Sequence, residues 1–281
     1  MKKIIFIVGL LFVPVIALAQ SGYDPEFLGN AAAAPRPGFS PKIFVSYYNQ
    51  NDISSSDAEL AIEPQYWIRG FTGEKKRDYV QFLAHLPIGY RTQKTAGVRS
   101  SVAGIGSLNA NVEHFFKMID DEDFTMWFDN GLSAGFPTAT MNDGVRIGMN
   151  AYSIGWFQEN FISFDKWVFS ISPIALTWTF RDSKTNIYPG LSMTIMNSSC
   201  GYQVTKDVAL GVTFAYMLGN VAGADDGLGG HLNASQRFYA GPAASISLGK
   251  DTSLQVSGIV DAYTKNADRG QGLFTAFWHM F

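Results

Sequence analysis

The most constraining feature of this sequence is an alternation of apolar and polar side chains that recurs in segments of about ten residues. Successive side chains of a β-strand point to opposite faces of its sheet. In Glu59–Arg69, for example, Leu60, Ile62, Tyr66 and Ile68 form an apolar row, and Ala61, Glu63, Gln65, Trp67 and Arg69 face the other way. A tilted strand of this length crosses a bilayer. The pattern therefore predicts strands with an apolar outer face.

Twelve segments show this pattern or continue it, and an even number suits a closed antiparallel barrel with both chain ends on one side. They are Pro41–Asn49, Glu59–Arg69, Val80–Ile88, Ser107–Met118, Phe124–Phe136, Asn150–Asn160, Lys166–Phe180, Leu191–Ser199, Val208–Leu218, Gln236–Leu248, Ser253–Asp261 and Gly272–Phe281. We expect an all-β, transmembrane antiparallel barrel.

The predicted connections alternate between short and long. Short ones are Ile119–Glu122, Ile162–Asp165 and Gly249–Thr252; long ones are Arg91–Ala103, Thr138–Met149, Arg181–Gly190 and Asn220–Ala234. Barrels of the outer membrane have tight periplasmic turns at one rim and longer external loops at the other. The remaining alternative is a secreted sandwich or a lectin-like fold.

Composition supports a lipid-facing exterior and excludes several other classes. Of 281 residues, 47% are hydrophobic and 16% are charged, which excludes a disordered chain. No stretch after the first twenty residues is apolar over eighteen positions, as a membrane-spanning helix would require. The single cysteine, Cys200, allows no intramolecular disulfide.

The N-terminus has the pattern of an export signal. Lys2 and Lys3 precede an apolar run that ends in Ala17-Leu18-Ala19, a small-x-small cleavage site. We expect residues 1–19 to be a signal peptide, 20–40 a periplasmic or luminal segment, and 41–281 the barrel. Cleavage would change the formal net charge from −3 to (21 − 2) − 24 = −5, which disfavours nucleic acid as a partner.

The chain ends on an aromatic residue, Phe281, in phase with Leu273 and Phe277. This ending resembles the recognition signal of bacterial outer-membrane barrels. We expect a bacterial outer-membrane location, contact with outer-membrane lipids, and binding of the C-terminal strand by the barrel assembly machinery.

Several short motifs resemble the outer-membrane family named for the meta pathway of phenol degradation. They are Gly22-Tyr23-Asp24-Pro25, Pro35-Arg36-Pro37-Gly38-Phe39, Phe44-Val45-Ser46-Tyr47-Tyr48-Asn49, Leu86-Pro87-Ile88-Gly89-Tyr90 and Gly104-Ile105-Gly106-Ser107-Leu108. Ser107 departs from the pattern, because the family has aspartate there. The resemblance implies an outer-membrane channel for hydrophobic or aromatic compounds.

The polar row opposite the apolar row supplies the candidate functional residues. Charged side chains at membrane depth line water or pair with one another. The candidate lumen-lining residues are Glu63, Gln65, Trp67, Arg69, Gln81, His85, Asn109, Asn111, Glu113, Trp127, Asp129, Glu159, Arg237, Gln255 and Asp261, and Lys166 and Phe157 are also assigned to this face. They would either select small-molecule solutes along a path or fill a solid, plugged barrel with ion pairs.

One motif matches an enzyme pattern. Gly131-Leu132-Ser133-Ala134-Gly135 has the spacing of a hydrolase nucleophile elbow, but it lies in an alternating strand with no helical pattern after it. An outer-membrane hydrolase using Ser133 and His85 is the alternative from another class, and a plugged structural or surface-binding barrel is the third. The histidine spacing matches no metal site, and Gly223–Gly227 lacks the later glutamate of a calcium loop. We therefore expect a passive channel with no catalytic residue, metal or cofactor.

Overall fold

The computed structural model describes residues 36–50, 55–72, 77–95, 98–142 and 145–281. The predicted signal peptide and most of the predicted 20–40 segment lie outside these residues. In the part that is described, no helix is long and apolar enough to cross a membrane.

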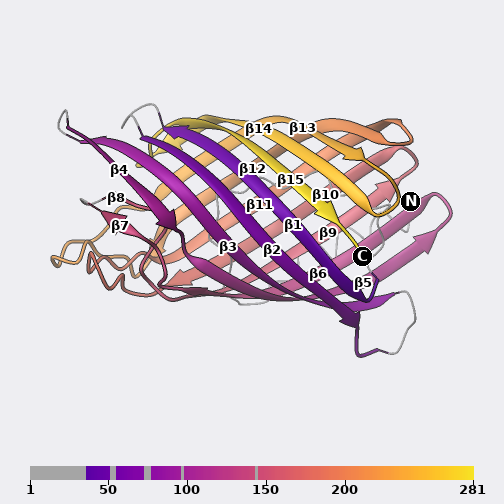
Figure 1. Cartoon of the computed structure of the whole chain (residues 1–281), viewed down its shortest axis with the longest axis horizontal. Coiled ribbons are helices and arrows are strands. Elements are labelled where there is room, and N and C mark those ends of the chain that lie inside the picture. The colour runs from indigo at the N-terminus through magenta and orange to yellow at the C-terminus, as the bar shows by residue number, and fades with distance from the viewer. Residues whose placement is uncertain (1–35, 51–54, 73–76, 96–97, 143–144) are drawn as a thin grey trace.

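Over the described residues, twelve strands form one closed antiparallel barrel, as predicted (Figure 1). They are β1 (Gly38–Gln50), β2 (Ser55–Arg69), β3 (Asp78–Thr95), β5 (Leu108–Asp121), β6 (Phe124–Phe136), β9 (Ser153–Phe164), β10 (Trp167–Thr179), β11 (Gly190–Thr205), β12 (Val208–Ala222), β13 (Ser235–Ser247), β14 (Thr252–Lys265) and β15 (Gly270–His279). The barrel closes where β1 pairs with β15, with Phe44 opposite Ala276. Pairing around the circumference satisfies most of the backbone of these strands in a lipid environment.

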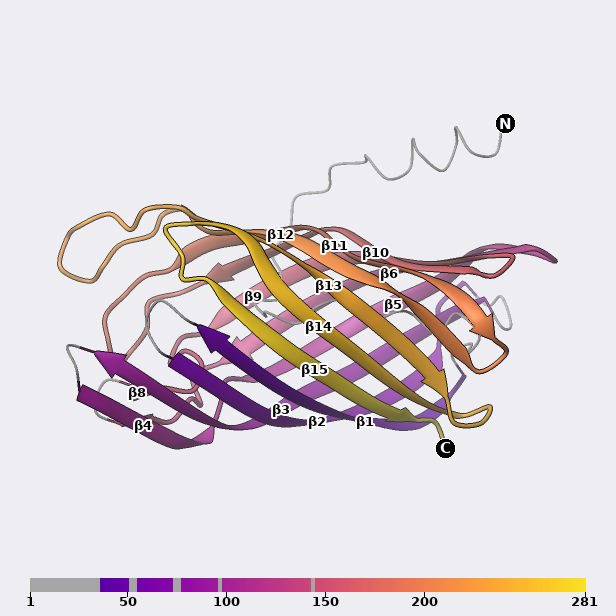
Figure 2. The ribbon, with the colours of Figure 1, turned by 90° about the horizontal axis from the view of Figure 1, so that it is seen from above.

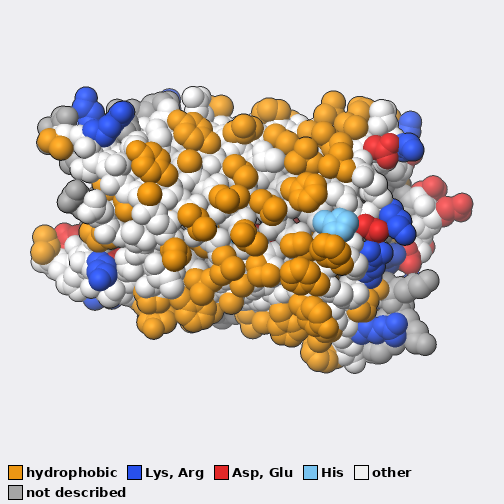
Figure 3. Space-filling view, in the orientation of Figure 1, with side chains coloured by type: hydrophobic (Ala, Val, Ile, Leu, Met, Phe, Trp, Pro, Cys, Tyr) orange, Lys and Arg blue, Asp and Glu red, His pale blue; other side chains and the backbone are white. Residues whose placement is uncertain are grey.

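Alternation along each strand separates an apolar outer face from a mixed inner face. On β1, Ile43, Val45 and Tyr47 are exposed, whereas Phe44 between them is buried. Figure 3 shows apolar side chains covering the middle of one face of the barrel, with charged side chains gathered at its two ends. Lipid solvates such a belt, and water solvates the two rims.

The two rims differ in the length of their connections, as predicted. Residues 122–123, 165–166, 206–207 and 248–251 make tight turns at the end where the C-terminus lies. Residues 137–152, 180–189 and 223–234 make long connections at the opposite end (Figure 2). We call these ends the short-turn rim and the long-loop rim.

The prediction of a long loop over Arg91–Ala103 is wrong. β3 continues to Thr95 and turns into a further strand, β4 (Val98–Ile105), so that Arg91 pairs with Val102. Both faces of this hairpin are rich in polar residues, so there is no apolar row by which alternation could reveal it.

Several strand ends also differ from the prediction. β1 begins at Gly38 rather than Pro41, β9 runs from Ser153 to Phe164, and β11 runs on to Thr205. The tight turn after β9 is therefore at residues 165–166, with Asp165 at a positive φ of 51°. Lys166, which was expected on the inner face, lies in this turn and is exposed.

The strand beside β3 is interrupted between β4 and β5, and the connection at 137–152 covers this interruption. β3 pairs with β4 along one half and with β5 along the other. The hydroxyl of Thr138 donates to the Gly106 carbonyl (2.8 Å) and accepts from the Leu108 amide (2.8 Å). Thr140 accepts from the Ile105 amide through Oγ1 (3.0 Å), and its own amide donates to the Ile105 carbonyl (2.8 Å). These contacts replace a strand ladder at the interruption. The same connection contains two short strands, β7 (Met141–Asn142) and β8 (Val145–Arg146).

Candidate functional site on the inner face of the barrel

The alternation of side chains along each strand places most of the candidate residues on the inner face. Residues directly paired across neighbouring strands share a face. The candidates found there are Glu63, Gln65, Trp67, Gln81, His85, Asn109, Asn111, Glu113, Trp127, Asp129, Glu159, Arg237, Gln255 and Asp261. Arg69 continues the same phase at the end of β2, but it is exposed at the short-turn rim.

Strand register brings acidic and aromatic residues into adjacent rows across β2, β3, β5, β6 and β9. The first row runs Trp67, Gln81, Glu113, Gly131, Phe157, and the next runs Tyr79, Phe115, Asp129, Glu159. Directly opposed residues in such rows have Cβ atoms about 5 Å apart. Rings and carboxylates thus alternate over one part of the inner wall.

An aromatic cluster lies toward the short-turn rim. Phe115 packs against Trp67 with ring centroids 4.8 Å apart and against Phe161 at 6.1 Å. In the same cluster, the ring centroids of Tyr79 and Trp127 lie 6.0 Å apart. These rings pack on one another and form a buried, apolar cluster on the inner face.

Lys42, Glu63, His85 and Glu59 form a charged network farther along the inner face. Lys42 Nζ lies 2.9 Å from Glu63 Oε2. His85 contacts both acids, with Nδ1 2.8 Å from Glu63 Oε1 and Nε2 3.3 Å from Glu59 Oε1. Glu63 contacts two basic groups and shares one of them, His85, with Glu59, which reduces the cost of burying its carboxylate.

A second acidic group contains Glu113, Asp129 and Glu159. Glu113 is buried and accepts a hydrogen bond from Asn111 Nδ2 at 3.1 Å. Asp129 lies directly opposite Glu159 across the β6–β9 ladder, and the Ser170 hydroxyl donates to Glu159.

A buried ion pair lies toward the long-loop rim. Arg237 Nε is 3.4 Å from Asp261 Oδ2, and both side chains are at most 5% exposed. Tyr48 donates its hydroxyl to Asp261 Oδ2 (2.7 Å) and accepts from Arg237 Nη1 (2.9 Å). The Gly270 amide also donates to Asp261 (2.8 Å). These hydrogen bonds compensate the buried charges.

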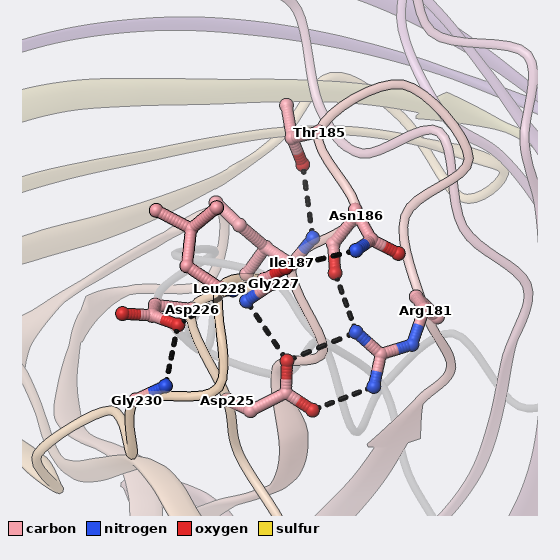
Figure 4. A network of polar contacts seen from close by, with 9 residues as sticks. All are labelled: Arg181, Thr185, Asn186, Ile187, Asp225, Asp226, Gly227, Leu228 and Gly230. Carbon is pink, nitrogen blue, oxygen red and sulfur yellow. Dashed lines mark hydrogen bonds and ion pairs between the residues drawn. The ribbon is translucent and has the colours of Figure 1, made fainter.

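Two connections at the long-loop rim are fastened together by the loop clasp, which we define as Arg181, Asn186, Asp225 and Asp226 (Figure 4). Arg181 Nη1 and Nη2 donate to the two carboxylate oxygens of Asp225 at 2.9 and 2.6 Å. Asn186 Nδ2 donates to the Gly227 carbonyl at 2.9 Å. The hydrogen bonds from Arg181 are the main cause that lowers the pKa of Asp225, and backbone amides of its own loop lower the pKa of Asp226. The acidic segment is therefore a structured loop.

The residues of the hydrolase alternative are not assembled as a catalytic pair. His85 is engaged with Glu63 and Glu59, whereas Ser133 lies in a register row with Asn111 and Gly155. Ser133 lies within strand β6, without the strand-to-helix turn of a nucleophile elbow. Over the described residues, no group of three or more His, Cys, Asp or Glu side chains is arranged to hold a metal ion.

Sequence reasoning did not select several residues of these networks. Lys42 and Tyr48 lie an even number of residues from the buried Phe44 on β1, so their side chains point to the same inner face. This alternation is the sequence signal that identifies them. Glu59 is the first residue of the predicted strand, whereas the strand begins at Ser55 in the structure. Contacts between strands remote in sequence, such as that of Arg237 with Tyr48, have no sequence signal.

Comparisons with known proteins identify the fold. No protein-family model matches the chain, and no curated protein sequence matches it. The solved structures similar to it include a COG4313 outer membrane channel from Pseudomonas putida F1, with a TM-score of 0.73 and 14% identity, covering 92% of this chain and 100% of that one. The transport unit of the autotransporter AIDA-I from Escherichia coli has a TM-score of 0.52 and 8% identity, covering 91% and 94%.

The fold and the inner face together define the class: an outer-membrane β-barrel with a polar and aromatic interior. The apolar outer belt and the two polar rims fit this location, and the predicted outer-membrane localisation is confirmed. At 14% identity, the likeness to the Pseudomonas channel is one of fold.

Proposed function

We propose that this protein is a passive outer-membrane channel for small solutes, including hydrophobic or aromatic ones. The observation that carries the proposal is the inner wall, where rows of carboxylates and amides alternate with rings inside a closed barrel. Polar groups provide hydrogen bonds along a path, and rings provide a surface for apolar parts of a solute.

The finer parts of the proposal rest on sequence. The resemblance to the phenol-degradation family suggests aromatic solutes. The aromatic residue Phe281 suggests recognition of the last strand by the barrel assembly machinery, and the N-terminal pattern suggests export with a cleaved signal peptide. The predicted lumen-lining residues are proposed to set which solutes pass.

The test is single-channel conductance of the refolded protein in a planar bilayer. We expect discrete conductance steps that simple aromatic solutes reduce. The control is the same preparation unfolded by heating before it is added, which should give no steps. A barrel that runs as folded on a gel and yet stays silent would contradict the channel and favour the plugged barrel.

The hydrolase alternative receives no support from the engagement of His85 with Glu63 and Glu59. We expect Ser133→Ala to leave the conductance unchanged and the refolded protein to cleave neither lipid nor ester. Ester cleavage that is abolished by Ser133→Ala would overturn this expectation.

A further inference from the structure

The inner wall around Glu113 combines a buried carboxylate, an unused acceptor and flanking rings. Among the described residues, the Glu113 carboxylate has one hydrogen-bond partner, Asn111 Nδ2. The other end of that amide, Asn111 Oδ1, is buried and has no partner among the described residues. Glu113 is 7% exposed and Asn111 is 5% exposed. Among the described residues, therefore, two buried acceptor groups on one strand face, two residues apart, are not fully hydrogen-bonded.

Three acidic side chains, Glu113, Asp129 and Glu159, lie in adjacent rows of this wall. Asp129 lies directly opposite Glu159 in the neighbouring row, and like charges in that position repel. Glu113 also interacts electrostatically with Glu159 and Glu63. A cation beside Glu113 would be attracted by these acidic groups and would favour the ionised form of Glu113.

The described cations near this wall are engaged elsewhere. Lys42 acts on Glu113 electrostatically, but its ammonium lies 2.9 Å from Glu63, and His85 also bonds to Glu63. Lys117 Nζ is paired with Asp120 at 2.7 Å. In none of these contacts does the cation donate a hydrogen bond to Asn111 Oδ1.

Rings lie on both sides of the acid. Trp67 and Phe157 belong to the same register row as Glu113, and Phe115 lies in the next row. Gly131, which pairs with Glu113, makes room for the Phe157 ring: a Cβ there would lie 2.1 Å from Phe157 Cζ. The ring therefore lies over Gly131, next to the acid.

The cluster already contains one ammonium over a ring. Lys117 Nζ lies 5.2 Å from the centroid of the Trp127 ring. An ammonium at such a distance is attracted by the ring face, and the attraction is stronger where water is excluded. The same chemistry is available to a ligand beside Glu113.

We propose that the wall around Glu113 binds the ammonium group of an arylalkylamine, a primary amine joined to an aromatic ring by a short alkyl chain, with the ring of the amine packed on the neighbouring rings. Glu113 and Asn111 Oδ1 accept hydrogen bonds from the ammonium, which has three N–H donors. The inference names a solute class for the proposed channel, and it rests on the proposed function in that respect alone.

The test is calorimetric titration of the refolded full chain in detergent with three ligands of one shape: 2-phenylethylammonium, 2-phenylethanol and 3-phenylpropionate. We expect saturable binding of the amine and affinities at least tenfold lower for the alcohol and the carboxylate. Equal affinities, or no binding of the amine, would overturn the proposal. This comparison needs no variant.

Two variants locate the site. Glu113→Gln should lower the amine affinity at least tenfold and leave binding of the alcohol unchanged. Glu122→Gln, which removes the same charge from the exposed turn at the short-turn rim, should change the amine affinity by less than twofold. Equal effects of the two substitutions would mean that overall charge, and not this wall, attracts the amine.

The outcomes separate this inference from the proposed function. Conductance steps without amine binding would leave the channel standing and refute the amine site. Amine binding by a silent barrel would support the site and refute the channel. Folding of each variant is checked by its migration on a gel without heating.

Discussion

At the scale of single residues, Gly131 is one of the glycines where an added side chain would force a neighbour to move. A Cβ there would lie 2.1 Å from Phe157 Cζ, so the ring would have to move. We predict that Gly131→Ala lowers the free energy of unfolding by about 1–3 kcal/mol, as overpacking does. Urea unfolding in lipid vesicles, followed by gel migration, measures this. Ser133→Ala, two residues along the same face, is the control and should change stability less.

Asp261 gives a second prediction at this scale, because its charge is buried against Arg237. We predict that Asp261→Asn costs about 3–5 kcal/mol, since it leaves the guanidinium uncompensated. The same unfolding assay measures this cost. The double variant Arg237→Met with Asp261→Leu removes both charges and should be more stable than the single variant. A single variant as stable as the original protein would show that the pair contributes nothing.

At the scale of elements, the loop clasp joins two connections through a bidentate pair. The Asp225 carboxylate accepts hydrogen bonds from both Nη1 and Nη2 of Arg181. We therefore predict that Asp225→Asn loosens the loop at 180–189, so that trypsin cuts after Lys184 several times faster. Timed digestion with mass spectrometry detects the cut. Asp207→Asn, in a short turn at the other rim, is the matched control and should not change the rate. Unchanged cleavage in Asp225→Asn would show that the clasp does not restrain the loop.

The same clasp predicts a pH dependence. Because the pKa of Asp225 is lowered in the folded loops, its stabilisation is complete above the ordinary aspartate pKa of about 3.9. That stabilisation is lost as the pH falls through the lower, folded value. We predict that hydrogen exchange in the two loops at neutral pH matches that at pH 5, after correction for the intrinsic rate, and that protection falls only in stronger acid. Loss of protection between pH 7 and 5 would point to a different group.

The elements also show how far sequence reasoning extends. Strands with one lipid face were predictable, since Leu60 and Ile62 alternate with residues of the opposite face. The β3–β4 hairpin was not, because polar residues on both of its faces leave no periodic apolar signal. The charged rows of the inner face could be predicted one strand at a time. The opposition of Asp129 and Glu159 depends on register, which alternation alone does not fix.

At the scale of the whole molecule, stability depends on closing the sheet. β15 is the partner of both β14 and β1, so its removal would expose two strand edges to lipid. We predict that a chain ending at Arg269 does not form a closed barrel. The measurement is gel migration: the full chain should run faster unheated than boiled, whereas the shortened chain should run alike in both states.

A control separates loss of closure from loss of the last aromatic residue. Phe281→Ala keeps β15 (Gly270–His279) and its pairing with β1, while it removes the ring that stacks on Phe39 at 6.3 Å. We expect this variant to refold in detergent and to keep its fast-migrating form, because refolding in vitro needs no assembly machinery. Loss of that form in Phe281→Ala would mean that the terminal ring itself, and not β15 pairing alone, is needed to close the barrel.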